Sequence, residues 1–167
     1  MLILFLILIM ITWFFMELAK RIYHIIYLVR ISLLFDTINS KEDLLFLRNK
    51  DFEYVVAEIF KRMGYRVRMS DHFGEGGTGI ILNDILYVQA RKERYQHLME
   101  IEQAKKLAKH MRENGIYRGM LITLGDFKNN TRNFCHLNVI KCINGNQLLQ
   151  MCKDTQGLGT LPLFERF

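Results

Sequence analysis

No charged residue occurs among the first sixteen residues of this 167-residue chain. Together with the next three residues, this aliphatic and aromatic stretch approaches the about 20 residues that a helix needs to cross a membrane. It lacks the basic start and small-residue end of a secretory signal peptide, so we expect no cleavage. The sequence predicts a transmembrane helix over about residues 1–19, and the alternative is a buried core helix.

Basic residues follow the apolar stretch, namely Lys20, Arg21 and Arg30. Because cytoplasmic flanks of membrane spans are enriched in Lys and Arg, the pattern predicts a single-pass protein with a cytoplasmic C-terminal domain. Residues 22–35 are also apolar but too short for a second span. We expect them to continue the helix or to lie at the membrane interface, and a re-entrant hairpin is a third option. Residues 1–35 are thus the predicted membrane anchor in a lipid bilayer, and polar residues 36–48 the linker.

The spacing of cysteine and histidine residues matches no metal site. The chain has three cysteines, Cys135, Cys142 and Cys152, without a CxxC pair, and its five histidines are scattered. This pattern excludes the common zinc motifs and is typical of reduced thiols. The formal net charge of +6 permits DNA or an anionic membrane surface as a partner and requires neither.

The rest of the chain has the periodicity of a soluble α/β domain. Helices are predicted at residues 49–63, 95–113, 127–134 and 147–152, and strands at 65–69, 80–82, 85–90, 119–123 and 137–143. Asn83 and Asp84 predict a two-residue hairpin turn. A hairpin followed by βαβ units indicates a mixed sheet flanked by helices. Residues 153–167 are expected to be irregular.

Five segments of this domain carry a more specific signal. They are Asp51-Phe-Glu-Tyr through Met-Gly-Tyr65, the loop Gly74-Glu-Gly-Gly-Thr-Gly-Ile80, Tyr87-Val-Gln-Ala-Arg91, Gly119-Met-Leu-Ile-Thr-Leu-Gly-Asp-Phe127 and Ile143-Asn-Gly-Asn-Gln-Leu148. In this order they resemble the Mrr-type restriction endonucleases, which belong to the PD-(D/E)XK nuclease superfamily. Each segment alone is weak, but the ordered set is specific. The resemblance implies a restriction-endonuclease-like fold over residues 49–152.

The resemblance also implies where catalytic side chains would lie. In this family, an Asp at the end of the loop and a Glu or Gln on the next strand hold Mg²⁺, while a Lys positions the attacking water. The equivalent positions here, with an acid of the first helix, are Glu53, Gly79, Gln89 and Arg91. A glycine has no oxygen ligand for a hard cation, and an always-charged arginine is a poor proton acceptor.

The expected catalytic outcome is a nuclease-like domain without intact catalysis and without a cofactor. Mg²⁺ would be expected only if the site is active, with ligands supplied by Glu53, Glu75 or Asp84. Arg91, Lys92 and Arg94 are the candidate DNA-binding residues.

Three functions remain open from the sequence. The first is a membrane-anchored DNA-binding protein with weak or lost cleavage. The second is a scaffold in a membrane-bound assembly, with a membrane-protein partner or a second copy of the chain and no nucleic acid. The third is an active Mg²⁺-dependent DNA endonuclease with a rearranged site. Salt-sensitive DNA binding separates the first from the second, and Mg²⁺-dependent nicking identifies the third.

Overall fold

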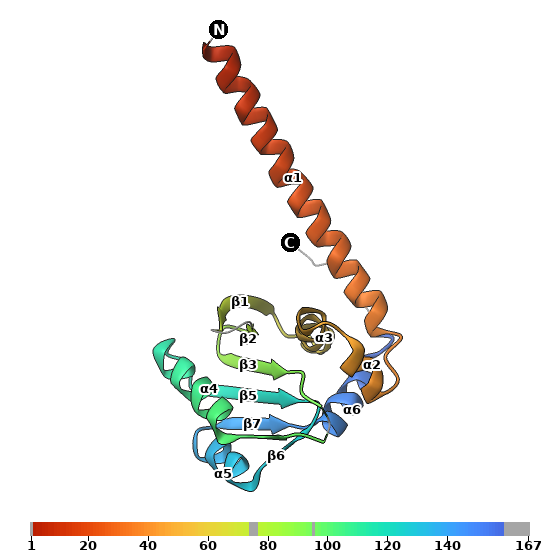
Figure 1. Cartoon of the computed structure of the whole chain (residues 1–167), viewed down its shortest axis with the longest axis vertical. Coiled ribbons are helices and arrows are strands. Elements are labelled where there is room, and N and C mark those ends of the chain that lie inside the picture. The colour runs from red at the N-terminus through yellow and green to blue at the C-terminus, as the bar shows by residue number, and fades with distance from the viewer. Residues whose placement is uncertain (1, 74–76, 95, 159–167) are drawn as a thin grey trace.

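The computed structural model of the chain describes residues 2–73, 77–94 and 96–158. A long helix extends away from an α/β domain (Figure 1). The helices are α1 (Leu2–Phe35), α2 (Lys41–Phe46), α3 (Asn49–Arg62), α4 (Ile101–Glu113), α5 (Asn129–Leu137) and α6 (Gly145–Thr155). The strands are β1 (Val67–Phe73), β2 (Gly77–Leu82), β3 (Leu86–Arg91), β4 (Leu98–Met99), β5 (Arg118–Thr123), β6 (Asp126–Phe127) and β7 (Ile140–Ile143).

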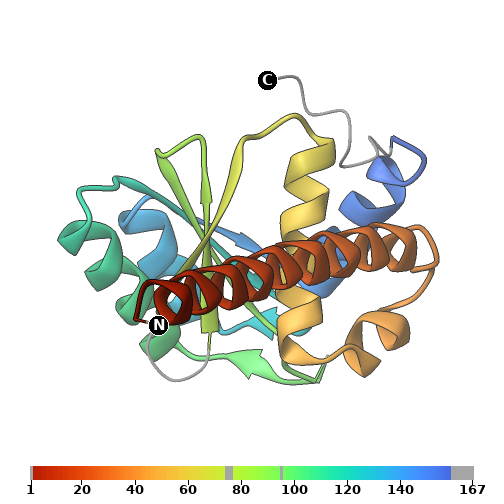
Figure 2. The ribbon, with the colours of Figure 1, turned by 90° about the horizontal axis from the view of Figure 1, so that it is seen from above.

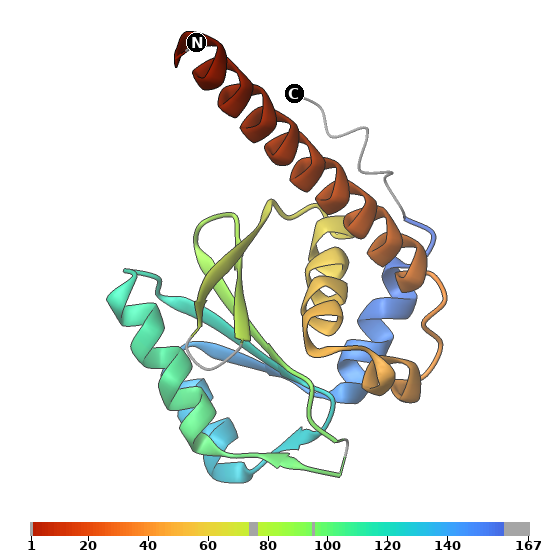
Figure 3. The same ribbon diagram turned by 45° about the horizontal axis from the view of Figure 1, so that its top comes forward.

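The main sheet has five strands in the order β1-β2-β3-β5-β7. The pairs β1–β2 and β2–β3 are antiparallel, whereas β3–β5 and β5–β7 are parallel. Helices α3 and α6 cover one face of this sheet, and α4 and α5 cover the other (Figure 3). The predicted mixed sheet flanked by helices is therefore confirmed. The short strands β4 and β6 pair separately from it.

Local sequence explains where the first elements of the domain begin and end. The apolar residues of α3 recur at helical spacing and are buried against the sheet. Gly64, with a φ of 89°, ends this helix, and Tyr65 N–H donates to the carbonyl of Phe60. Asn83 and Asp84 both have positive φ, as a type I′ turn requires, so the predicted hairpin turn between β2 and β3 is present.

Two hydrophobic clusters fill the two sides of the sheet. Alternate residues of each strand point to opposite faces, so Ile80 and Val88 join the cluster beneath α3 and α6. Ile81 and Tyr87 join the cluster beneath α4 and α5. This alternation identifies the face on which every other side chain of β2 and β3 lies.

The helix α1 has two different environments along its length. From Phe5 to Met16 the large apolar side chains are exposed, and Met10 is 70% accessible. By contrast, Ile31 and Phe35 are 2% and 0% exposed, because the end of α1 packs into the cluster beneath α3. Seen from above, α1 runs across the domain and turns back into it at α2 (Figure 2). Residues 22–35 thus continue the helix.

The transmembrane span predicted over about residues 1–19 is not found. Within residues 2–73, 77–94 and 96–158, no helix combines the length and apolarity needed to cross a membrane. In α1, fifteen uncharged residues, 2–16, precede Glu17. Such a stretch of helix is about 22 Å long, against the roughly 30 Å of a bilayer's hydrocarbon core.

Residues 36–48 differ from a simple linker. Ile38 and Leu44 are buried in the same cluster as Phe35. Ser40 caps α2 by accepting from Asp43 N–H, while the Asp43 carboxylate accepts from Ser40 N–H. The segment is therefore folded onto the domain, and α1 enters the core without a flexible connection.

Two glycines lie where β5 ends and α6 begins. The N–H of Gly145 donates to the carbonyl of Gly125 at 3.1 Å. A Cβ on Gly145 would collide with the carbonyl of Leu124, and one on Gly125 would collide with that of His97. Both positions are backbone-to-backbone contacts that leave no room for a side chain.

Candidate active-site strands

The strand pair β2–β3 brings together the residues expected at the active site. Gly79 on β2 pairs directly with Gln89 on β3. Arg91 follows two residues later on β3 and pairs with Thr123 of β5. Gly79 and Arg91 thus lie on neighbouring strands.

These positions share one face of the sheet. Side chains two apart on a strand point the same way, so Gln89 and Arg91 lie on the face of Tyr87, beneath α4 and α5. The same alternation places Gly79 on the face of Ile81, next to Gln89. Gly79, Gln89 and Arg91 are therefore spatial neighbours, and the β2 position beside Gln89 carries no side chain.

Two polar atoms on this face are buried without a hydrogen-bond partner among the described residues. They are Oε1 of Gln89, a residue that is only 3% exposed, and Nε of the half-buried Arg91. An unsatisfied buried polar group typically costs about 1–3 kcal/mol. One atom is an acceptor and the other is a charged donor, and the surrounding protein encloses both.

Gly79 lies in a strand, not in the glycine-rich loop that the sequence predicted. It pairs with Ser70 on one side and Gln89 on the other, with the extended backbone of β2. Any residue can adopt this conformation. The glycine is therefore not required by a left-handed turn, and its effect is the absence of a carboxylate beside Gln89.

Lys92 and Arg94, predicted with Arg91 to contact DNA, differ in their surroundings. The Lys92 ammonium donates to the carbonyl of Leu45 at 3.1 Å and also to that of Leu47. These carbonyls lie at the end of α2, where a cation is favourable. Lys92 therefore fastens α2 to the end of β3, while Arg94 is exposed.

The three carboxylates considered as replacement ligands do not gather beside Gln89. Glu53 is buried on α3, the helix on the opposite face of the sheet, where it has a partner. Asp84 lies in the hairpin turn and pairs with Arg66 and Arg68. Three residues of β2, 80–82, lie between Gly79 and the turn, which is roughly 10 Å of strand. Glu75 lies outside the described residues.

The described residues do not form a site for Mg²⁺. No group of three or more His, Cys, Asp or Glu side chains that could hold a metal occurs among them. The expected ligand set reduces to the neutral amide of Gln89 beside a permanent cation, Arg91. Since Mg²⁺ prefers several hard oxygen ligands and is repelled by a neighbouring cation, these residues do not suit it.

One further residue near this face was missed by reasoning from the sequence. Oε1 of Gln103, on α4, is also buried without a hydrogen-bond partner among the described residues. A glutamine on an amphipathic helix has no distinguishing pattern, and only the packing of α4 against the sheet reveals that its amide oxygen is enclosed.

Comparisons with known proteins define the class to which the fold and these strands belong. The family model of the Mrr catalytic domain, described as restriction endonuclease, matches residues 44–152. The chain belongs to this restriction endonuclease family.

Among solved structures, the chain is similar to the MspJI restriction endonuclease in complex with a 27-mer oligonucleotide, with 18% sequence identity and a TM-score of 0.43. The alignment covers 82% of this chain and 33% of that chain, so the present chain spans about a third of its length. A search of curated proteins found no match.

Proposed function

We propose that this protein is a DNA-binding member of the restriction endonuclease family whose cleavage activity is weak or lost. The observation that carries the proposal is the pairing of Gly79 with Gln89, two residues before Arg91 on the same face. Phosphodiester hydrolysis in this family needs a metal to polarise the phosphoryl oxygen and to activate water. Here the charged ligand and the proton-handling lysine are both replaced.

Arg91 is suited to a different task at the same position. Its guanidinium stays charged and presents a planar set of donors that matches two oxygens of a phosphate. Arg91 is only half-buried, at the end of β3, so we expect its guanidinium group to reach a backbone phosphate. DNA held there would bind through its backbone, with affinity that falls steeply as salt rises.

DNA titration of the full-length protein in lipid nanodiscs tests this function. A labelled duplex is titrated at two salt concentrations, with Mg²⁺ and with EDTA, and the products are run on a denaturing gel. We expect salt-sensitive binding in both conditions and no Mg²⁺-dependent cleavage. Arg91→Ala should reduce the slope of log affinity against log salt by about one unit.

Arg66→Ala is the matched control, because Arg66 is an exposed arginine at the far end of the hairpin, paired with Asp84. Its salt slope should equal that of the unmodified protein. Absence of DNA binding at low salt would instead favour the scaffold function, with a membrane-protein partner or a second copy. Robust cleavage with Mg²⁺ would contradict the proposed loss of activity and indicate a rearranged metal site.

We also propose that α1 associates with a lipid bilayer. Apart from Thr12, its exposed side chains from Phe5 to Met16 are apolar on every side of the helix, whereas docking to a protein groove needs only one apolar stripe. The apolar length is sufficient for insertion into the hydrocarbon layer. Lys20 and Arg21 come one turn after this stretch, where the anionic headgroups begin, and they favour the cytoplasmic side for the domain.

Trp13 provides a direct readout, because it is the chain's single tryptophan and is 66% exposed. With vesicles, we expect the protein to float and the Trp13 emission to shift to shorter wavelength. The matched variant Phe5→Ser with Phe14→Ser should lose flotation while the domain remains folded. Protein that stays at the bottom of the gradient, with unshifted emission, would exclude lipid association. In intact cells, external protease should leave the domain uncut.

A further inference from the structure

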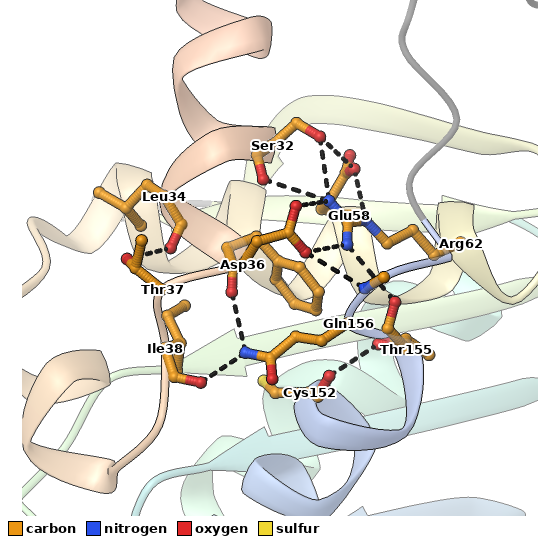
Figure 4. Close-up of polar contacts among 12 residues, drawn as sticks. Ser32, Leu34, Asp36, Thr37, Ile38, Glu58, Arg62, Cys152, Thr155 and Gln156 are labelled. Atoms are coloured by element: carbon orange, nitrogen blue, oxygen red, sulfur yellow. Dashed lines mark hydrogen bonds and ion pairs between the residues drawn. The ribbon is translucent and has the colours of Figure 1, made fainter.

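The end of α1 is fastened to the domain by one buried arginine. The side chain of Arg62, on α3, is fully buried and ion-paired with Asp36 and Glu58 (Figure 4). Its Nη2 donates to Asp36 Oδ2 at 3.0 Å and to the backbone carbonyl of Ser32 at 3.2 Å. The guanidinium also lies over the ring of Phe35, 4.4 Å from the ring centre.

The C-terminal end of α6 joins the same contact. Arg62 Nη1 donates to the carbonyl of Thr155, and Gln156 Nε2 donates to the carbonyls of Phe35 and Ile38. The carbonyl of Phe35, the last residue of α1, is thereby held by Gln156, which directly follows α6. We call the set of Ser32, Asp36, Arg62, Thr155 and Gln156 the Arg62 junction.

A second contact lies further along α1. The hydroxyl of Tyr27 donates to Asp51 at 2.7 Å, and the rings of Tyr27 and Tyr54 pack edge to face. Asp51 and Tyr54 both belong to α3, so α1 and α3 are joined at two separate levels. Two attachment points on one helix fix its direction, whereas a single point would allow it to pivot.

The part of α1 beyond these contacts contains no residue that would let it bend. Residues 2–35 include neither glycine nor proline, which cause most sharp kinks in helices. The apolar half of α1 is consequently a continuous extension of a segment buried in the core.

We propose that the Arg62 junction makes α1 a rigid arm, which holds the Gln89–Arg91 face of the domain at a fixed orientation to the lipid surface. This inference rests on the proposed association of α1 with lipid. It assigns Arg62 as a positioning residue, distant from any bound DNA. The bilayer surrounds the apolar half of α1. The domain keeps a fixed orientation to α1 and does not swing on a flexible linker.

The charge state of the junction agrees with this assignment. Hydrogen bonding from Arg62 is the largest cause that holds the pKa of the Asp36 carboxyl below its ordinary value of 3.8. Burial opposes the charge of Arg62, but its bonds to Asp36 and Glu58 raise its pKa above the ordinary value. The ion pair therefore persists throughout the neutral range.

Distances between two spin labels test the rigidity on the full-length protein in nanodiscs. Labels are attached at Tyr23→Cys on α1 and Tyr117→Cys on the domain, which are 73% and 83% exposed sites. All labelled proteins carry Cys142→Ser, which removes the half-buried native thiol. Cys135 and Cys152 are fully buried and should not react with the label. We expect a narrow distance distribution, and a broad one when three glycines are inserted after Phe35.

Arg62→Met is expected to broaden the distribution towards that of the glycine insertion, whereas Arg66→Met, a matched change of an exposed arginine, should leave it narrow. If Arg62→Met fails to fold, the milder double variant Asp36→Asn with Gln156→Ala replaces it, and we expect the same broadening of the distance distribution. A broad distribution in the unmodified protein, or a narrow one in a folded junction variant, would overturn the inference. Vesicle flotation, measured separately, reports whether lipid association itself has failed.

Discussion

Gly79 of β2 and Gln89 of β3 are direct partners across the antiparallel pair, on the face of the sheet that α4 covers. A side chain at position 79 would therefore lie beside the Gln89 amide. Replacing a glycine is often unfavourable because the glycine has a positive φ. Gly79 has the extended conformation of a strand, so another residue can adopt its backbone angles. This makes the missing carboxylate a feature that can be restored.

The first prediction concerns that restoration. Gly79→Asp should place a carboxylate beside the Gln89 amide, and this pair of oxygen ligands should give measurable binding of Mg²⁺ or Mn²⁺ by calorimetry, where the unmodified protein shows none. Adding Arg91→Lys replaces the guanidinium with a more flexible ammonium that can move away from the metal, and it should strengthen that binding. Gly79→Asn, which lacks the negative charge, is the control. A folded Gly79→Asp protein without metal binding would show that the Gly79–Gln89 pair is not the metal position.

Lys92 gives a prediction about stability. Because its ammonium donates to the carbonyls of Leu45 and Leu47, Lys92→Met should lower the free energy of unfolding by about 1–3 kcal/mol. The apolar stem is retained, so the change reports the lost hydrogen bonds. DNA affinity of the folded protein should stay close to that of the unmodified chain. Urea denaturation with a DNA titration measures both, and a large loss of affinity without a loss of stability would contradict this role.

Truncation should separate the two halves of α1. A chain that begins at Ile22 keeps the buried α1 residues Ile31 and Phe35 and should fold and remain in solution. A chain that begins at Ser40 also loses Ile31, Phe35 and Ile38 from the core, each with about 1.5–3 kcal/mol of burial. We expect this shorter chain to be unfolded or aggregated by circular dichroism. Equal stability of the two chains would contradict the packing of α1.

The three thiols should differ in reactivity. A hydrogen bond with Cys135 is the main cause that lowers the pKa of Cys142, and the same contact raises the pKa of Cys135. Burial raises the pKa of Cys152 to about 12. Since the thiolate is the nucleophile, iodoacetamide at neutral pH should label the half-buried Cys142 first. Mass spectrometry of peptides follows the order, and Cys142→Ser should abolish the fast phase. Faster labelling of Cys152 would contradict the expected order.

Much of the domain was predictable because its signals are local. The apolar period of α3, the turn residues Asn83 and Asp84 and the ordered family segments predicted the helix, the hairpin and the mixed sheet. The placement of Gly79 in a loop was wrong because glycine-rich segments favour turns, whereas here β2 begins at Gly77 and brings Gly79 into the sheet.

Contacts between distant segments could not be predicted in the same way. In the sequence, Lys92 lies in a basic cluster of the kind that binds phosphate. In the fold, its ammonium donates to two carbonyls at the end of α2, about 45 residues earlier in the chain. The Arg62 junction joins residues up to 121 positions apart, as Gln156 and Phe35 are. No periodicity or motif in the sequence predicts such a pairing. Residues 36–48 are mostly polar and were predicted to be a linker, but Ile38 and Leu44 pack into the core.

The contact between Gly125 and Gly145 has a consequence for how this family is recognised. Both glycines belong to segments that carry the resemblance, yet neither offers a group that could take part in hydrolysis. Main chain touches main chain at both positions. A larger residue at Gly145 would push the start of α6 away from Leu124, and one at Gly125 would push the chain away from the carbonyl of His97. Such positions tolerate no substitution whether or not the chain still cuts DNA. A saturation library screened only for folding should therefore leave both as glycine, while Gly79 and Arg91 accept many residues. These two positions of the family pattern are thus fixed by packing and are independent of any chemistry at the site.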